Sequence, residues 1–225
     1  MVRQQVVMGA GVLLGLLVLA TAGRADEGTA VKAIEKLGGR VMRDDMQPGK
    51  PVVGVDLHFT KVTDADLKEL KELKSLQFLH LGDTAVTDAG LKDLKELKSL
   101  QQLTLAATGV TDAGLKELKG LTDMRRLYLL RTQVTDAGLK ELKELKHLEE
   151  LSLTSTQVTD TGLKELKGLK RLQTLYLAYT KVTDAGLKDL QELKQLTSLN
   201  LQNTQVTDAG LKNLKEALPR CRIVP

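Results

Sequence analysis

The chain has 225 residues, of which 46 are Leu, while Phe, Tyr and Trp together number only five. Charged residues make up 28% and apolar residues 42%, a balance that excludes a disordered tail. A single Cys excludes a disulfide scaffold and a Cys-rich zinc module. The net charge of +4 is small beside 33 basic and 29 acidic residues, so we expect no nucleic-acid partner.

The first 25 residues predict a signal peptide. Arg3 gives a positive start, an uncharged apolar stretch runs from Val6 to Ala22, and small residues offer cleavage after Ala22 or Ala25. We therefore expect an exported protein, periplasmic or secreted, with no membrane span after cleavage. The alternative is tethering to the membrane by an uncleaved N-terminal anchor, because the apolar stretch reaches the lower limit of roughly 17 residues for spanning a bilayer.

A unit of 24 residues is repeated in register along the rest of the chain. The tetrad Val-Thr-Asp-x begins at Val62, Val86, Val110, Val134, Val158, Val182 and Val206. Gly follows the tetrad in every copy except the first, which carries Asp66 instead. A Thr column closes the units at Thr60, Thr84, Thr108, Thr132, Thr156, Thr180 and Thr204. Because no insertion interrupts the spacing, the pattern predicts a solenoid of stacked units.

Two hydrophobic periods inside each unit predict a short strand and a short helix. Residues 79–81 read Leu-His-Leu, and this alternation is typical of a half-buried strand. Leu67, Leu70 and Leu73 recur every three residues between Lys and Glu, which favours a short amphipathic helix with a solvated outer face. Neither segment can bury its leucines alone, so the copies must stack and share one leucine column.

The unit L-x-x-L-x-L-x-x-T-x-V-T-D-x-G-L resembles the leucine-rich repeat, with Thr where that family usually has Asn or Cys. The Val-Thr-Asp-Ala-Gly-Leu segment resembles secreted bacterial leucine-rich repeat proteins. The resemblance covers roughly residues 52–218. It implies an α/β fold, a right-handed horseshoe-shaped solenoid with parallel strands on the concave face and short helices on the convex face. We expect the Thr hydroxyls to assume part of the role of the family's Asn ladder, which satisfies loop backbone groups.

Segments at both ends are expected to cap the leucine column. The expected organisation is a signal peptide over 1–25, an N-terminal cap of helix plus strand over 26–54, a solenoid of about seven units over 55–218, and a C-terminal cap over 219–225. Within the first cap we predict a helix from Thr29 to Leu37 and a strand from Arg40 to Arg43. At the other end Pro219 stops the last helix, and Ile223 falls in an inward strand position.

The copies differ mainly at the positions that flank the two strand leucines, which we expect to face outward along each strand. All five aromatic residues fall there together with two Arg, whereas Lys is absent from every one of these positions. Rigid aromatic side chains and Arg are typical of binding hot spots, although strand surfaces also favour Tyr and Phe for structural reasons alone. The residues that we predict to bind a partner are Phe59, Phe78, His80, Arg126, Tyr128, Arg131, Glu150, Tyr176 and Tyr179. Glu150 is expected to pair with Arg126 on the neighbouring strand.

Two other arrangements suggest chemistry, and both are weaker. Asp56, His80 and Thr104 share one strand offset and should lie side by side, as acyl transfer would need. An open sheet, however, offers no evident oxyanion donors and does not exclude water. His58 and His80 with Asp83 could approach a metal ion but lack a fixed third ligand.

The repeated Asp and Lys columns have simpler interpretations. The Asp column from Asp64 to Asp208 lacks the nonapeptide of a calcium solenoid, so helix capping by Asp and its neighbouring Thr is preferred. The Lys residues that recur in every helix predict a solvated convex face.

We therefore expect a non-enzymatic protein without cofactor or bound metal that recognises another macromolecule through its concave face. The expected partner is a protein, and a glycan is the alternative. Two further functions stay open: a structural or self-associating envelope component without a specific ligand, and an inhibitor of an extracellular enzyme.

Overall fold

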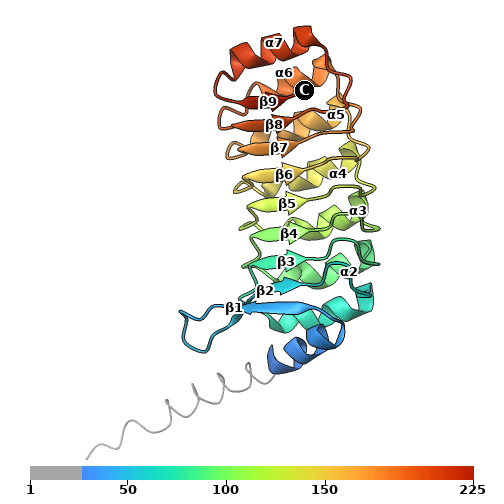
Figure 1. Ribbon diagram of the computed structural model, residues 1–225, viewed down its shortest axis with the longest axis vertical. Coiled ribbons are helices and arrows are strands. Elements are labelled where there is room, and N and C mark those ends of the chain that lie inside the picture. The colour runs from blue at the N-terminus through green and yellow to red at the C-terminus, as the bar shows by residue number, and fades with distance from the viewer. Residues whose placement is uncertain (1–26) are drawn as a thin grey trace, which may run out of the picture.

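The computed structural model describes residues 27–225, so the expected signal peptide lies outside the described residues. After a helix over residues 27–36, short strands alternate with short helical segments. The strands stack in chain order with the helices along one side (Figure 1). The strands are β1 (Arg40–Arg43), β2 (Val52–Asp56), β3 (Phe78–His80), β4 (Gln102–Thr104), β5 (Arg126–Tyr128), β6 (Glu150–Ser152), β7 (Thr174–Tyr176), β8 (Ser198–Asn200) and β9 (Arg222–Val224).

The helical segments lie between consecutive strands and are of two kinds. The α-helices are α2 (Asp88–Leu91), α3 (Asp112–Leu115), α4 (Asp136–Leu139), α5 (Asp160–Leu163), α6 (Asp184–Leu190) and α7 (Asp208–Ala217). The 3₁₀ helices are η1 (Asp64–Glu72), η2 (Lys92–Glu96), η3 (Lys116–Leu118), η4 (Lys140–Glu144) and η5 (Lys164–Gly168). The predicted short amphipathic helix is therefore present in each unit, but much of it has 3₁₀ geometry. A 3₁₀ helix has three residues per turn, so leucines spaced by three all face the core.

The sheet is parallel from β2 to β9, and its register follows the 24-residue period without a slip. Leu79, Leu103 and Leu127 occupy successive strand centres and pair with one another across β3, β4 and β5. Each is at most 1% exposed and belongs to one continuous core that also contains the helical leucines. The fold is therefore an α/β solenoid built round one buried leucine column, as the repeat predicts.

The Thr column closes the turn that follows each strand. Thr108 Oγ1 donates to the carbonyl oxygen of Leu105 at 2.7 Å, and the same bond recurs in all seven copies. The bond satisfies a loop carbonyl next to the core, as expected of a residue that stands in for Asn.

The Asp column joins neighbouring units instead of capping its own helices, which corrects part of the capping prediction. From the second tetrad onward the Thr caps its own helix: Thr111 Oγ1 accepts from the backbone N–H of Ala113 at 3.2 Å. The carboxylate of Asp88 in the preceding unit accepts from the N–H of Thr111 at 2.8 Å and from its hydroxyl at 2.7 Å. The same pair of bonds links every unit from Asp64 to Thr207, and we call this row the Asp–Thr ladder.

The Asp–Thr ladder explains the Gly of the repeat and its one exception. A Cβ at Gly90 would lie 2.5 Å from Oδ1 of Asp64, so only Gly leaves enough space for the carboxylate to lie against the helix. The first unit has Arg40 where a preceding Asp would stand. There Asp66, which replaces the Gly, accepts from the N–H and the hydroxyl of Thr63 at 2.8 and 2.7 Å. Asp66 therefore supplies from within its own unit the acceptor that later units receive from their neighbour.

The two ends of the described chain complete the core. The helix over residues 27–36 buries Ala30 and Ile34. β1 pairs antiparallel with β2 and brings Met42 onto Gly54. β9 pairs with β8 so that Ile223 lies in the Leu199 column. Within residues 27–225 no helix has the length and apolar character needed to cross a bilayer.

Candidate binding surface

The first and third residues of the three-residue strands face away from the leucine column, and we call the surface that they form on β3–β8 the open sheet face. Between these positions the central Leu of each strand is buried. Six predicted binding residues lie on this face, namely Phe78, His80, Arg126, Tyr128, Glu150 and Tyr176.

The other three predicted residues lie in turns, so placing all nine on strands was wrong. Phe59, Arg131 and Tyr179 follow the strands and adopt left-handed backbone conformations, with φ between 55° and 57°. The N–H of Arg131 still bonds to the next unit, at Thr154 O, but the left-handed residue turns the chain away from the sheet. Phe59 and Tyr179 are 74% and 61% exposed. They occupy the same offset five units apart, and Phe59 lies against the ring of His58, with centroids 5.0 Å apart.

Glu150 is the centre of the best-connected group on the open sheet face. Arg126 on β5 lies beside it, with Nε 3.8 Å from Oε2, which confirms the expected pair. Arg126 Nη1 also donates to Oε1 of Gln102 on β4 at 3.3 Å. Both charged side chains are partly exposed, so their pairing contributes at most about 1 kcal/mol and leaves the guanidinium available to a ligand.

Two tyrosines complete this group. Tyr128 on β5 and Tyr176 on β7 are the two register partners of Ser152 on β6, one on each side. Ser152 is buried between them. Burial, the charge of Glu150 and a hydrogen bond to it raise the pKa of Tyr128 to about 12. The same three causes raise the pKa of Tyr176. Both phenols are therefore protonated at neutral pH, and both interact with the same carboxylate. We call Arg126, Tyr128, Glu150 and Tyr176 the Glu150 cluster.

Phe78 and His80 belong to a second region, because β4 separates their strand from β5. They line a shallow pocket of about 200 Å³ near the N-terminal end of the open sheet face, together with Met42, Asp56 and Gln102. The sequence-predicted residues thus fall into a central cluster, this pocket and the exposed turns.

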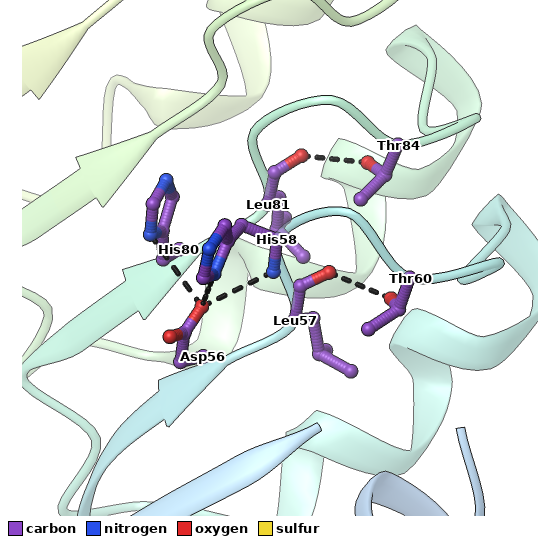
Figure 2. Close-up of polar contacts among 7 residues, drawn as sticks. All are labelled: Asp56, Leu57, His58, Thr60, His80, Leu81 and Thr84. Atoms are coloured by element: carbon purple, nitrogen blue, oxygen red, sulfur yellow. Dashed lines mark hydrogen bonds and ion pairs between the residues drawn. The ribbon is translucent and has the colours of Figure 1, made fainter. Parts of the chain in front are cut away.

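Asp56, His58 and His80 form a polar cluster beside that pocket (Figure 2). Asp56 Oδ1 lies 2.6 Å from Nδ1 of His58 and 3.5 Å from Nδ1 of His80, and it accepts from the N–H of His58 at 3.1 Å. The two imidazole rings are stacked, with centroids 4.7 Å apart and planes 7° from parallel. The third member is Asp56, whereas the sequence analysis had placed Asp83 there.

The charges of the three groups depend on one another. Burial alone would raise the pKa of Asp56, but the hydrogen bonds and charge from His58 lower it overall. Burial lowers the pKa of His80 despite the nearby charge of Asp56. The cluster therefore combines an ionised carboxylate with an imidazole whose neutral form is favoured.

The row of Asp56, His80 and Thr104 is in register, as expected. Within residues 27–225, however, no hydrogen bond joins His80 to Thr104. A hydroxyl nucleophile needs a base within hydrogen-bond reach, so this row has no activated nucleophile.

Comparison with known proteins agrees with the fold. A leucine rich repeat family profile matches residues 146–206, and a second leucine rich repeat profile matches residues 72–95. Internalin C2 from Listeria monocytogenes superposes with a TM-score of 0.59 at 24% identity, covering 89% of this chain and 92% of that chain. An internalin (inlF) from the same organism gives a TM-score of 0.46 at 16% identity, with 75% and 58% covered. Among curated proteins, no sequence matches this chain.

The profile matches and the stacked parallel strands define a repeat solenoid. The chain is a leucine-rich repeat protein. Proteins of this family are typically non-catalytic modules that bind other proteins.

Proposed function

We propose that this protein is a non-catalytic binding module that recognises another macromolecule, a protein in the first instance, through the open sheet face. The observation that carries the proposal is the Glu150 cluster. Two tyrosines and an arginine there gather round one carboxylate, on strands whose other sides are fixed by the buried leucine column. Tyr and Arg are the residue types that most often dominate binding energy.

Rigidity supports this role. The strands that carry the Glu150 cluster are held by the leucine column and are linked by parallel backbone bonds, so little order has to be gained on binding. Arg126 and both phenols already have partners, but the partners are partly exposed groups that a ligand can replace. An acidic side chain of a partner could take the place of Glu150 next to Arg126.

The convex side lacks these features. Every Lys of the repeated column, from Lys68 to Lys212, is exposed, and the charge pattern hardly changes from unit to unit. Such a uniform face is typical of a solvated surface. We further propose that the protein is exported, on the ground of its N-terminal sequence.

The test is affinity capture from the exporting cell's envelope, with the protein as bait. The decisive variant replaces Arg126, Tyr128 and Tyr176 with Ala. Its matched control replaces Lys92, Lys116 and Lys140, which are equal in number and lie on the helices. A specific partner should be lost by the first variant and kept by the second, and circular dichroism should show both variants folded.

Self-association makes the opposite prediction and can be separated in the same preparation. A structural component would form larger species as its concentration rises, detected by light scattering, and the Ala substitutions would not change them. A partner that both variants retain would count against the open sheet face. Glycan arrays with the same pair of variants distinguish a saccharide from a protein.

A further inference from the structure

Three potential metal ligands converge at the N-terminal end of the open sheet face, away from the Glu150 cluster. Asp56 ends β2, His58 lies in the turn that follows, and His80 ends β3. One ligand atom from each residue lies within 4.8 Å of the other two. Their side chains are 30%, 38% and 42% exposed, so an ion can enter from solvent without any rearrangement of the fold.

We propose that Asp56, His58 and His80 bind a divalent transition-metal ion, Zn²⁺ by preference. The proposal rests on the donor set and its geometry and is independent of the partner-binding function. Two imidazoles and one carboxylate suit zinc and its neighbours, whereas Ca²⁺ and Mg²⁺ prefer all-oxygen sites. The Nδ1 atoms of both rings already point at the same oxygen, Oδ1 of Asp56 (Figure 2).

The distances require only a small adjustment. Zn–N and Zn–O bonds of about 2.0–2.2 Å hold tetrahedral ligands about 3.3 Å apart. The separation of 3.5 Å between His80 and Asp56 is already close to this value. The 2.6 Å contact between His58 and Asp56 must open, which a rotation of the partly exposed carboxylate can provide. The ion would thus replace the hydrogen bond that now joins these two side chains.

The imidazole ring of His80 has space because the residue at position 82 is Gly. Gly82 lies beside the ring of His80, and a Cβ at Gly82 would stand 3.0 Å from Nε2 and 3.4 Å from Cδ2. The same offset holds a side chain in all five later units: Ala106, Leu130, Thr154, Ala178 and Gln202. The only Gly at this offset therefore occurs where His80 needs the space.

Three protein ligands leave a tetrahedral ion with one open position, which water or a ligand can occupy. Asp56 and His80 line the shallow pocket with Met42, Phe78 and Gln102. The fourth ligand would therefore come from solvent or from an oxygen or nitrogen donor that enters this pocket.

The experiment is a calorimetric titration of the untagged full-length protein with Zn²⁺, combined with the visible spectrum of the Co²⁺ form. We expect one ion per chain and the strong absorption bands of a four- or five-coordinate Co²⁺ site. Asp56→Asn and His80→Gln should each weaken binding by about tenfold or more. At the same Zn²⁺ concentration the ion should raise the Tm of the wild type by more than that of Asp56→Asn.

Matched controls separate this site from its neighbours. Asp83→Asn removes the acidic residue closest in sequence to His80, and His147→Gln removes the third His of the chain; both should bind Zn²⁺ as the wild type does. Circular dichroism checks that each variant is folded. Absence of a one-to-one complex in the wild type, or equal binding by wild type and Asp56→Asn, would overturn the proposal and leave the three groups as a hydrogen-bonded network.

Discussion

At every boundary between units the same contacts recur, whereas the open sheet face carries a different pair of side chains on each strand. The boundaries repeat the leucine column and the Asp–Thr ladder almost without change. The face changes from Phe and His on β3 to Arg and Tyr on β5 and to Glu and Ser on β6. The difference follows from what each position contacts. A boundary residue must fit an identical neighbour, while a face residue contacts no repeated partner and can vary.

The largest contrast should be between adjacent residues of one strand. Leu127→Ala leaves a cavity in a column where the side chain is fully buried, and we expect a loss of about 2–5 kcal/mol in the free energy of unfolding. Tyr128→Ala changes the open sheet face and should cost about 1 kcal/mol or less. Urea denaturation of both variants measures the two losses. Equal losses would mean that Tyr128 belongs to the core and not to the binding surface.

The close approach of Gly and Asp at each boundary gives the next largest effect. Gly114→Ala places a methyl group against the Asp88 carboxylate and should destabilise the fold by about 1–3 kcal/mol, although Ala normally favours helix. Gly168→Ala is the control, because its Cβ would meet only the flexible end of Lys146 at 3.3 Å. In the double variant Asp88→Ala with Gly114→Ala the clash with the carboxylate is gone and the 2.9 Å approach to Cδ1 of Leu91 remains, so the loss should be smaller than the sum of the two single losses.

The leucine column and its register could be predicted from the sequence because the 24-residue spacing has no insertion. The end of each strand could not be predicted. The alternation of apolar and polar residues continues into the turn, and this alternation does not show where the backbone becomes left-handed. For that reason Arg131 and Tyr179 were placed on strands.

The metal-ligand cluster was partly visible in the sequence. Asp56 and His80 share an offset, and His58 lies two residues after Asp56. The sequence analysis considered Asp56 and His80 only as part of a catalytic row with Thr104. It considered His58 and His80 separately, as two metal ligands without a fixed third one. Only the stacking of the two rings over one carboxylate shows that they are a single group.

The Asp–Thr ladder predicts a position-dependent effect of a single substitution. Asp136→Asn weakens two bonds to Thr159 and should cost about 1 kcal/mol, as for a charge-assisted hydrogen bond at a partly exposed site. Asp208→Asn should change stability by less than about 0.5 kcal/mol, because within residues 27–225 no hydrogen bond joins the Asp208 carboxylate to a Thr of another unit. Equal losses in urea denaturation would show that the Asp acts on its own helix.

The same ladder should make stability depend on pH. The hydroxyl and then the backbone N–H of Thr207 lower the pKa of Asp184 from 3.8. Because the folded pKa is depressed, this contribution is fully present above the unfolded pKa and is lost as the pH falls through the folded value. The stability gap between wild type and Asp184→Asn should therefore be constant from pH 7 to about pH 5 and narrow as the pH falls below 3.8. A gap that persists at low pH would mean that charge is not involved.

The smallest effect is a titration of the open sheet face, and it distinguishes surface electrostatics from packing. Removing the charge with Glu150→Gln should lower the pKa of Tyr128 from about 12 toward the ordinary value of 10.0, but not fully, because burial is the larger cause. Tyrosinate absorbance measures the shift, and Tyr128→Phe identifies the signal. An unchanged Tyr128 would show that Glu150 does not interact with it, and the cluster would then be two separate tyrosines beside an ion pair.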